Sequence, residues 1–367
     1  MNTARKTLSP VVAALLVFAA GCAGDEPEAR PTTVVTAAEE KPEPEPLTLE
    51  VAEREFRTFV TNDDVARAAG DERLALNWVS DGESPLIAAE YRKAAFDGDP
   101  VKRYTYGKPK LYVPKLEPDV FPQWFVASVP RSVQGEKKSE ETALMAFILR
   151  SPEDHWTLSL QAELDPKAKQ PKIPLDAEGY ATALTTADSS VLIRPREMPG
   201  IHATLVYEGP GSVAAKVMRS GPVTTGYYEQ FRKARRKARQ KDLTLTRVPT
   251  ATPYPIFQLR TEHGGGLVLY SLYRNSVTGV KDKEDRTAKP PIPPEIAHLL
   301  DGTVEGNEIH ASEVLQFAAY DPARPEEGDK GDEGDGEDGE KKEPDKAEVI
   351  ADAGGYYKGV TPPAKNP

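Results

Sequence analysis

The chain has 367 residues, of which 38% are hydrophobic and 29% are charged, and its formal net charge is −11. This length allows two ordinary domains, each with a core of its own. The negative charge is concentrated near the C-terminus, where 13 acidic and 5 basic residues fall within 321–348. The rest of the chain is only mildly negative, which argues against a general nucleic-acid-binding protein.

The N-terminus has the organisation of an export signal. Arg5 and Lys6 precede an uninterrupted apolar run over 11–20, and a glycine then leads to Cys22. The apolar run is too short to cross a bilayer as a helix. We therefore expect residues 1–21 to be a signal peptide that is removed.

The segment Ala19-Ala20-Gly21-Cys22 resembles the lipobox of bacterial lipoproteins, in which cleavage precedes the cysteine and the thiol carries a lipid. The match is imperfect, because Ala19 stands where the lipobox usually has leucine. The resemblance implies at least two acyl chains on Cys22, which is enough for stable anchoring. Because this is the only cysteine, its acylation would exclude disulfides, a cysteine nucleophile, a thiolate zinc site and an iron–sulfur cluster. The alternative is an ordinary secretory signal with an incidental cysteine.

A tether and a first α+β domain are expected to follow. Residues 22–46 are small, acidic and proline-bearing, which predicts a disordered segment. Within 47–186, apolar residues first recur at helical spacing, and the period then changes to two. Helices are predicted around 49–60, 74–79 and 84–96, and strands around 104–113, 121–129, 143–150 and 156–164.

The remaining residues, 187–361, are predicted to form a second α+β domain of the same order. Helices are predicted over 212–219 and 225–241, and strands over 243–248, 256–261, 267–273 and 314–320. A polar, proline-rich insertion is expected at 275–310 and a disordered acidic insertion at 326–346. Three local similarities in the same order favour a tandem duplication: 121–124 with 254–257, 160–166 with 315–322, and 176–180 with 352–356.

These features together resemble uncharacterised actinobacterial lipoproteins whose halves are NTF2-like or cystatin-like. The resemblance rests on the lipobox, the order of helices followed by a strand meander, and the two copies of Asp-Ala-x-Gly-Tyr. It covers most of residues 47–361. It implies an α+β fold of two tandem repeats, each with helices packed on a curved antiparallel sheet. None of the motifs is catalytic, so the resemblance implies a fold class and no activity. The Asp and Gly of both Asp-Ala-x-Gly-Tyr copies predict a turn, with the Tyr entering the next strand.

The segment 231–241 is the densest basic run of the chain. On a helix, Tyr227, Phe231, Ala234 and Ala238 would form a narrow apolar seam. The rest of that helix carries candidate contacts for an anionic surface, namely Arg232, Lys233, Arg235, Arg236 and Arg239. The alternatives are a solvated helix whose seam packs on the sheet, and screening of the helix by the acidic insertion.

No catalytic or metal-binding set is recognisable in the sequence. The segment 263–266 (His-Gly-Gly-Gly) is similar to an oxyanion-hole loop of hydrolases, but no Gly-x-Ser-x-Gly accompanies it, so a hairpin turn is predicted. The histidines are scattered without an i, i+4 pair, so we predict no metal site and no cofactor. If an NTF2-like sheet encloses a pocket here, four aromatic residues are candidate lining residues, with a core position as the alternative: Tyr104, Tyr106, Trp124 and Trp156.

We therefore expect a non-enzymatic binding or interaction module, anchored through Cys22 to the extracytoplasmic face of the cell membrane. Its expected partners are the membrane and either an envelope protein or a small ligand, and not nucleic acid. One alternative is an envelope enzyme of the hydrolase type, which should show acid, base or nucleophile converging in a cleft with perturbed pKa values. The other is a structural spacer that presents the acidic tail, which predicts no pocket in either half.

Overall fold

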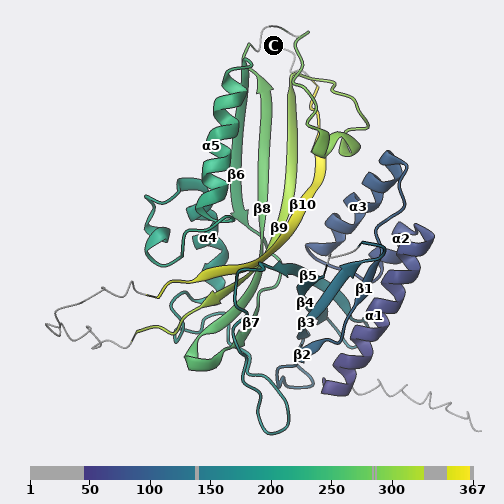
Figure 1. Ribbon diagram of the computed structural model, residues 1–367, viewed down its shortest axis with the longest axis vertical. Coiled ribbons are helices and arrows are strands. Elements are labelled where there is room, and N and C mark those ends of the chain that lie inside the picture. The colour runs from purple at the N-terminus through teal and green to yellow at the C-terminus, as the bar shows by residue number, and fades with distance from the viewer. Residues whose placement is uncertain (1–44, 137–139, 283–284, 286, 326–344, 364–367) are drawn as a thin grey trace, which may run out of the picture. The chain divides into compact units, whose positions relative to one another are not determined.

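The computed structural model describes residues 45–136, 140–282, 285, 287–325 and 345–363 (Figure 1). The predicted signal peptide, Cys22, nearly all of the predicted tether and most of the acidic insertion lie outside the described residues. The described residues belong to one unit, which runs from Pro44 onward. Among them, no helix is both long and apolar enough to cross a membrane.

Three helices open the described chain, as the helical spacing predicts. They are α1 (Leu49–Ala69), α2 (Glu72–Leu76) and α3 (Glu83–Asp97). The hydroxyl of Thr48 accepts a hydrogen bond from the Val51 amide and caps α1, which ends at Gly70 in the left-handed conformation. Helix α3 begins one residue before the predicted start at 84, and it ends at Gly98, which is also in the left-handed conformation.

Five strands follow these helices. The predicted long strand over 104–113 is divided into two short strands, and the other three lie close to their predicted positions. The five are β1 (Tyr104–Tyr106), β2 (Lys110–Tyr112), β3 (Gln123–Val133), β4 (Glu141–Leu149) and β5 (Thr157–Leu164).

The second half also begins with helices. Helix α4 (Met198–Glu208) was not predicted, the expected helix at 212–219 is a short 3-10 turn (Val213–Lys216), and α5 (Thr225–Arg239) lies where the basic run predicted it. Five strands follow, namely β6 (Leu243–Ala251), β7 (Phe257–Arg260), β8 (Gly266–Val280), β9 (Glu308–Asp321) and β10 (Glu348–Val360). The segment 263–266 connects β7 to β8, in agreement with the predicted hairpin turn.

Two predictions about the second half need correction. The segment 275–310 is not entirely an insertion, because β8 continues to Val280 and β9 begins at Glu308, with a 3-10 turn (Pro294–Leu299) between them. The motif at 352–356 is not a turn, because it lies within β10. Its supposed counterpart at 176–180 is a turn, in which the Asp176 carboxylate accepts hydrogen bonds from the Glu178 and Tyr180 amides.

All ten strands form a single antiparallel sheet. Its order is β1-β3-β4-β5-β10-β9-β8-β6, with β2 also paired to β3 and β7 to β8. The predicted pair of separate sheets is therefore wrong, because β5 and β10 join the halves through Leu164 opposite Ala351 and Glu163 opposite Asp352. No tandem repeat is evident. The sequence similarity of 121–124 to 254–257 equates β3, a strand of 11 residues, with β7, a strand of 4 residues that pairs with β8.

Apolar side chains fill three main regions around this sheet. Phe56 and Phe59 of α1 pack on Phe147 of β4, with ring centroids 6.0 and 5.3 Å apart. Met198 and Leu205 of α4 pack with Tyr270 and Phe317 in a second region. A third region includes Ile148, Leu160, Phe257, Leu269 and Ile350, and it brings strands of both halves together. The two halves thus share a core as well as a sheet.

Candidate functional site

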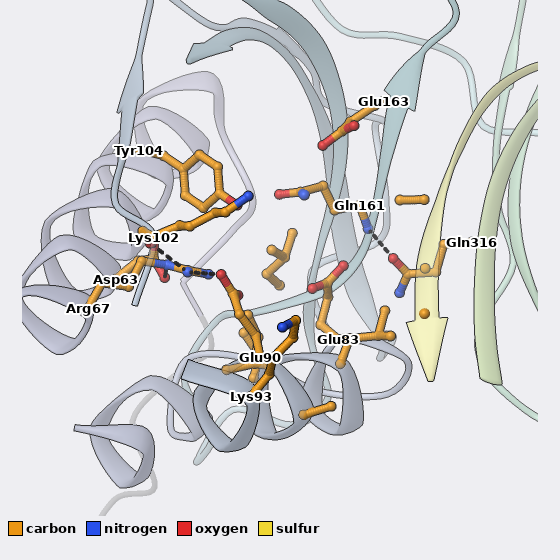
Figure 2. A pocket seen from close by; sticks show the side chains of 18 of the residues that line it. Asp63, Arg67, Glu83, Glu90, Lys93, Lys102, Tyr104, Gln161, Glu163 and Gln316 are labelled. Carbon is orange, nitrogen blue, oxygen red and sulfur yellow. Dashed lines mark hydrogen bonds and ion pairs between the residues drawn. The ribbon is translucent and has the colours of Figure 1, made fainter. Parts of the chain in front are cut away.

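A cavity of about 500 Å³ opens between α1, α3 and the strands where the two halves meet. Its walls carry mostly charged and polar side chains, as Figure 2 shows. Helices α1 and α3 supply five of them, Asp63, Arg67, Glu83, Glu90 and Lys93. Lys102 lies just before β1, and strands supply Tyr104, Arg131, Gln161, Glu163 and Gln316. The cavity therefore depends on elements from both halves of the chain.

The carboxyl group of Glu83 is the least compensated charge in this cavity. Glu83 is only 5% exposed, and it forms no ion pair with any described residue. It lies in the first turn of α3, where the helix dipole favours negative charge. Burial raises the pKa of Glu83 to about 7, although Arg131 and Arg67 act to lower it. Near neutral pH this carboxyl can both hold and release a proton.

The guanidinium group of Arg67, in contrast, already has partners within the protein. Its guanidinium pairs with Asp63 at 2.7 Å and with Glu90 at 2.9 Å, and it donates to the Lys102 carbonyl at 2.9 Å. Asp63 and Arg67 are both buried, and burial raises the pKa of Asp63 against the opposing effect of Arg67. This cluster fixes α1, α3 and the approach to β1 around one side of the cavity.

Arg131 is the second buried guanidinium, and it also has a protein partner. It pairs with Glu163 across the sheet. The ring of Tyr104 lies between the two arginines, 4.2 Å from the Arg131 guanidinium carbon and 4.9 Å from that of Arg67. Cation–π contacts of this kind stabilise both charges. The Tyr104 ring therefore already contacts two cationic groups of the protein.

Gln316 of β9 presents an unpaired donor to the same region. Its side-chain oxygen accepts a hydrogen bond from the backbone N–H of Gln161, with a nitrogen–oxygen distance of 3.1 Å. Its side-chain nitrogen is buried and has no hydrogen bond of normal geometry to a described residue, although its action as a donor toward the Glu83 carboxylate lowers the pKa of Glu83. A Cβ at Gly82 would lie 2.7 Å from this nitrogen, so glycine lets α3 begin directly against β9. An unsatisfied buried amide is costly unless something else accepts from it.

The cavity has no conventional nucleophile among the described residues. No serine, threonine or cysteine of the described chain lines it, and burial raises the pKa of both Tyr104 and Tyr106, which disfavours phenolate. In the part of the chain that the structure describes, no group of three or more histidine, cysteine, aspartate or glutamate side chains could hold a metal ion. The arrangement can bind a polar molecule or exchange a proton with one through Glu83.

The four predicted lining residues are divided by the structure. Tyr104 and Tyr106 line the cavity. Trp124 packs instead on Phe257, with ring centroids 5.6 Å apart, and Trp156 is buried against Phe125, with ring centroids 5.2 Å apart. Neither tryptophan lines the cavity.

Sequence analysis missed Glu83, Arg67, Arg131 and Gln316. A signal was present for some of them: Asp63 and Arg67 continue the apolar stripe of Phe56 and Phe59, and charges on a buried stripe mark an unusual site.

The predicted basic surface lies on α5. Arg232, Lys233, Arg235, Arg236 and Arg239 are all exposed, whereas Ala238 is buried. The apolar seam of α5 faces the sheet, because the Arg247 guanidinium of β6 lies 5.8 Å from the Phe231 ring and Arg274 of β8 lies 4.7 Å from the Tyr227 ring. Screening of this face by 326–346 involves residues that are largely outside the described part of the chain.

Fold and site together define an α+β protein with one ten-stranded antiparallel sheet, helices packed on that sheet and a cavity lined by charged side chains. The chain belongs to the family described as a domain of unknown function (DUF8094), whose sequence model matches residues 45–332. That match includes every residue of the cavity discussed above.

Two curated proteins with the printed name "Uncharacterized lipoprotein" are similar to this chain. One, from Streptomyces coelicolor, is 31% identical over 205 residues, which cover 52% of this chain and 55% of that protein. The other, from Streptomyces avermitilis, is 24% identical over 222 residues, which cover 60% of this chain and 63% of that protein. The chain thus spans somewhat more than half the length of these relatives. No solved structure shows a significant match to it.

Proposed function

We propose that this chain is a lipoprotein of the cell envelope, anchored by lipid on Cys22, that binds a small polar molecule in the cavity beside Glu83. The observation that carries the binding function is a buried, unpaired carboxyl group facing a cavity of about 500 Å³. The support for anchoring is the lipobox-like sequence ending at Cys22 and the printed name of the two Streptomyces relatives.

The energetic argument favours binding over a purely structural role. A buried charge without a partner destabilises a fold, and natural proteins keep such groups mainly where they act. The volume is typical of a site for a small molecule, and the few convergent polar groups would give orientation. A spacer that only presents an acidic tail has no need of either feature.

An envelope enzyme is the second candidate function, and one observation favours it. A carboxyl group with a pKa of about 7 suits general acid–base catalysis near neutral pH. The chemistry would be proton transfer at a bound substrate, because the lining residues supply no hydroxyl or thiol nucleophile. Turnover of a bound molecule that is lost in Glu83→Gln, with binding retained, would favour the enzyme over the binding module.

The basic face of α5 belongs to the same proposal as a contact for the anionic membrane surface. Its support is the exposure of Arg232, Lys233, Arg235, Arg236 and Arg239 on one helix. Each such cation near an anionic bilayer contributes about 1 kcal/mol of binding. A lipid anchor would keep this face within reach of the bilayer.

We also propose that each half is one NTF2-like or cystatin-like copy of an ancestral unit. The support is the strand order, which runs β1-β3-β4-β5 from one edge and β6-β8-β9-β10 from the other, each with one short additional strand. This correspondence equates β3 with β8 and β5 with β10. A solved structure in which β3–β5 and β8–β10 superpose in that order supports the duplication, and a superposition limited to one hairpin contradicts it.

A cavity-filling substitution tests the binding function. Gly355 of β10 lines the cavity, and a Cβ there would meet only the Leu86 side chain, at 4.0 Å, so Gly355→Leu should occupy the cavity without a severe clash. Gly211→Leu is the matched control, because Gly211 is exposed and has no neighbouring atom within 4 Å of its Cβ position.

The readout is the set of small molecules that co-purify with the chain from an actinobacterial envelope, compared by mass spectrometry. A molecule present with the wild type and with Gly211→Leu, but lost with Gly355→Leu, is the expected result. Identical small-molecule content in all three proteins would contradict a binding function for this cavity.

A further inference from the structure

We propose that the ligand of this cavity is a small organic cation, whose ammonium group pairs with Glu83 and whose adjacent oxygen accepts a hydrogen bond from Gln316. This inference rests on the proposed binding function and names the class of molecule bound. It uses two neighbouring features of the site, a buried carboxyl without an ion pair and a buried amide donor without a well-formed hydrogen bond to a described residue.

The two buried arginines of the cavity already have carboxylate partners, which disfavours an anion as the ligand beside them. Arg67 has Asp63 and Glu90 as partners, and Arg131 has Glu163. An anion that bound either arginine would have to displace one of these carboxylates. Among the buried charged side chains that line the cavity, Glu83 is the one without an ion pair to a described residue, and it carries a negative charge when ionised. A cation would complete this pair without disturbing the others.

The side chain of Gln316 adds the second requirement. It is fully buried, its oxygen is held by the Gln161 amide, and its nitrogen has no well-formed partner among the described residues. The orientation of this amide is fixed, because a backbone N–H can only donate and therefore requires the side-chain oxygen. The free N–H groups then need an acceptor, and an oxygen close to the ligand's ammonium group would supply it.

The aromatic residues contribute little to this recognition. Both arginines already lie beside the Tyr104 ring, and Tyr106 makes an edge contact with Phe56 at 6.2 Å. An aromatic cage for a quaternary ammonium is therefore not available at these two rings. A primary ammonium, which can donate hydrogen bonds to the Glu83 carboxylate, fits better.

Three matched probes test the charge requirement. Glycinamide carries an ammonium and a carbonyl acceptor, propionamide replaces the ammonium by a methyl group, and malonamate replaces it by a carboxylate. Binding to the full soluble chain with Cys22→Ala would be titrated by ligand-observed NMR at pH 7.5. We expect saturable binding of glycinamide that is at least about tenfold tighter than that of the other two, because a desolvated charge pair discriminates strongly.

Two variants test the assignment to Glu83. Glu83→Gln should weaken glycinamide binding at least about tenfold while keeping side-chain volume. Glu178→Gln is the control, because Glu178 is exposed and pairs with Lys115 at 2.8 Å. Near-UV circular dichroism would verify that both variants keep the native packing.

The outcomes separate this inference from the function on which it rests. If propionamide or malonamate binds as tightly as glycinamide, and Gly355→Leu abolishes that binding, the cavity is a binding site but its ligand is not a cation. If glycinamide binds equally well to Glu83→Gln, the role of Glu83 is refuted. If glycinamide shows no saturable binding to the wild type at millimolar concentration, the cationic class is refuted, and the co-purification experiment still decides whether the cavity binds anything.

Discussion

Glu83→Gln should stabilise the protein at alkaline pH while removing its proposed ligand. Burial raises the pKa of Glu83 from its usual 4.5 to about 7 in the folded protein. Between these two values the folded state holds a proton that the unfolded state has lost, so the free energy of unfolding falls as pH rises. Glutamine has the same shape and no such titration.

The size of the effect follows from the two pKa values. For a group whose pKa moves from 4.5 to about 7 on folding, the stability lost between pH 5 and pH 8 is about 2 to 3 kcal/mol. Urea unfolding of the wild type and Glu83→Gln at both pH values measures it. Taking the difference between the two proteins cancels other groups, including Asp321, whose pKa burial also raises to about 7.

The expected result is a difference in the free energy of unfolding that shifts by about 2 to 3 kcal/mol in favour of Glu83→Gln as pH rises from 5 to 8. Glu178→Gln should show no such shift, because its side chain is exposed. A difference that stays constant with pH, or that moves in favour of the wild type, would show that Glu83 has a stabilising partner in the folded protein. Glu83 would then not be an uncompensated carboxyl group.

Three further predictions concern other parts of the molecule. Arg67→Met should destabilise the fold by about 3 to 5 kcal/mol, because it leaves Asp63 and Glu90 without their buried partner; a loss below about 1 kcal/mol in urea unfolding would contradict the described network. Arg235→Glu with Arg239→Glu, in the chain with Cys22→Ala, should lower binding to vesicles containing anionic lipid more than about tenfold, with Lys167→Glu and Lys169→Glu as the control pair; equal losses for both pairs would remove the special role of α5. Asp321→Asn should reduce the loss of stability between pH 5 and pH 8, because burial raises the pKa of Asp321 to about 7; an unchanged pH profile in urea unfolding would contradict that shift.

Local sequence patterns predicted most elements that have one polar and one apolar side. Helices α1 and α5 have such patterns, and they lie near their predicted positions. Strands β3 to β5 also lie near their predicted positions, although they are buried on both faces along most of their length. Helix α4 was missed because its sequence, MPGIHATLVYE, is apolar on most sides and is buried between the sheet and its neighbours. The segment 352–356 of β10 was predicted to be a turn, because its paired glycines are usual turn residues.

The joining of the halves could not be predicted from such patterns. Pairing between β5 and β10 brings together residues nearly 190 positions apart, and only tertiary contacts determine it. The cavity depends on the same event, since Glu83 and Gln316 meet only when α3 begins against β9. A charged residue on an apolar stripe, as at Arg67, was the sole local indication of a polar interior there.

The most direct test of the central claim is native mass spectrometry of the wild-type chain released from the envelope in mild detergent. We expect a protein that begins at Cys22 and carries lipid, with a small-molecule adduct that Gly355→Leu loses and Gly211→Leu retains. A lipid-bearing protein without any adduct, or with the same adduct in Gly355→Leu, would contradict the claim that this cavity binds a small molecule.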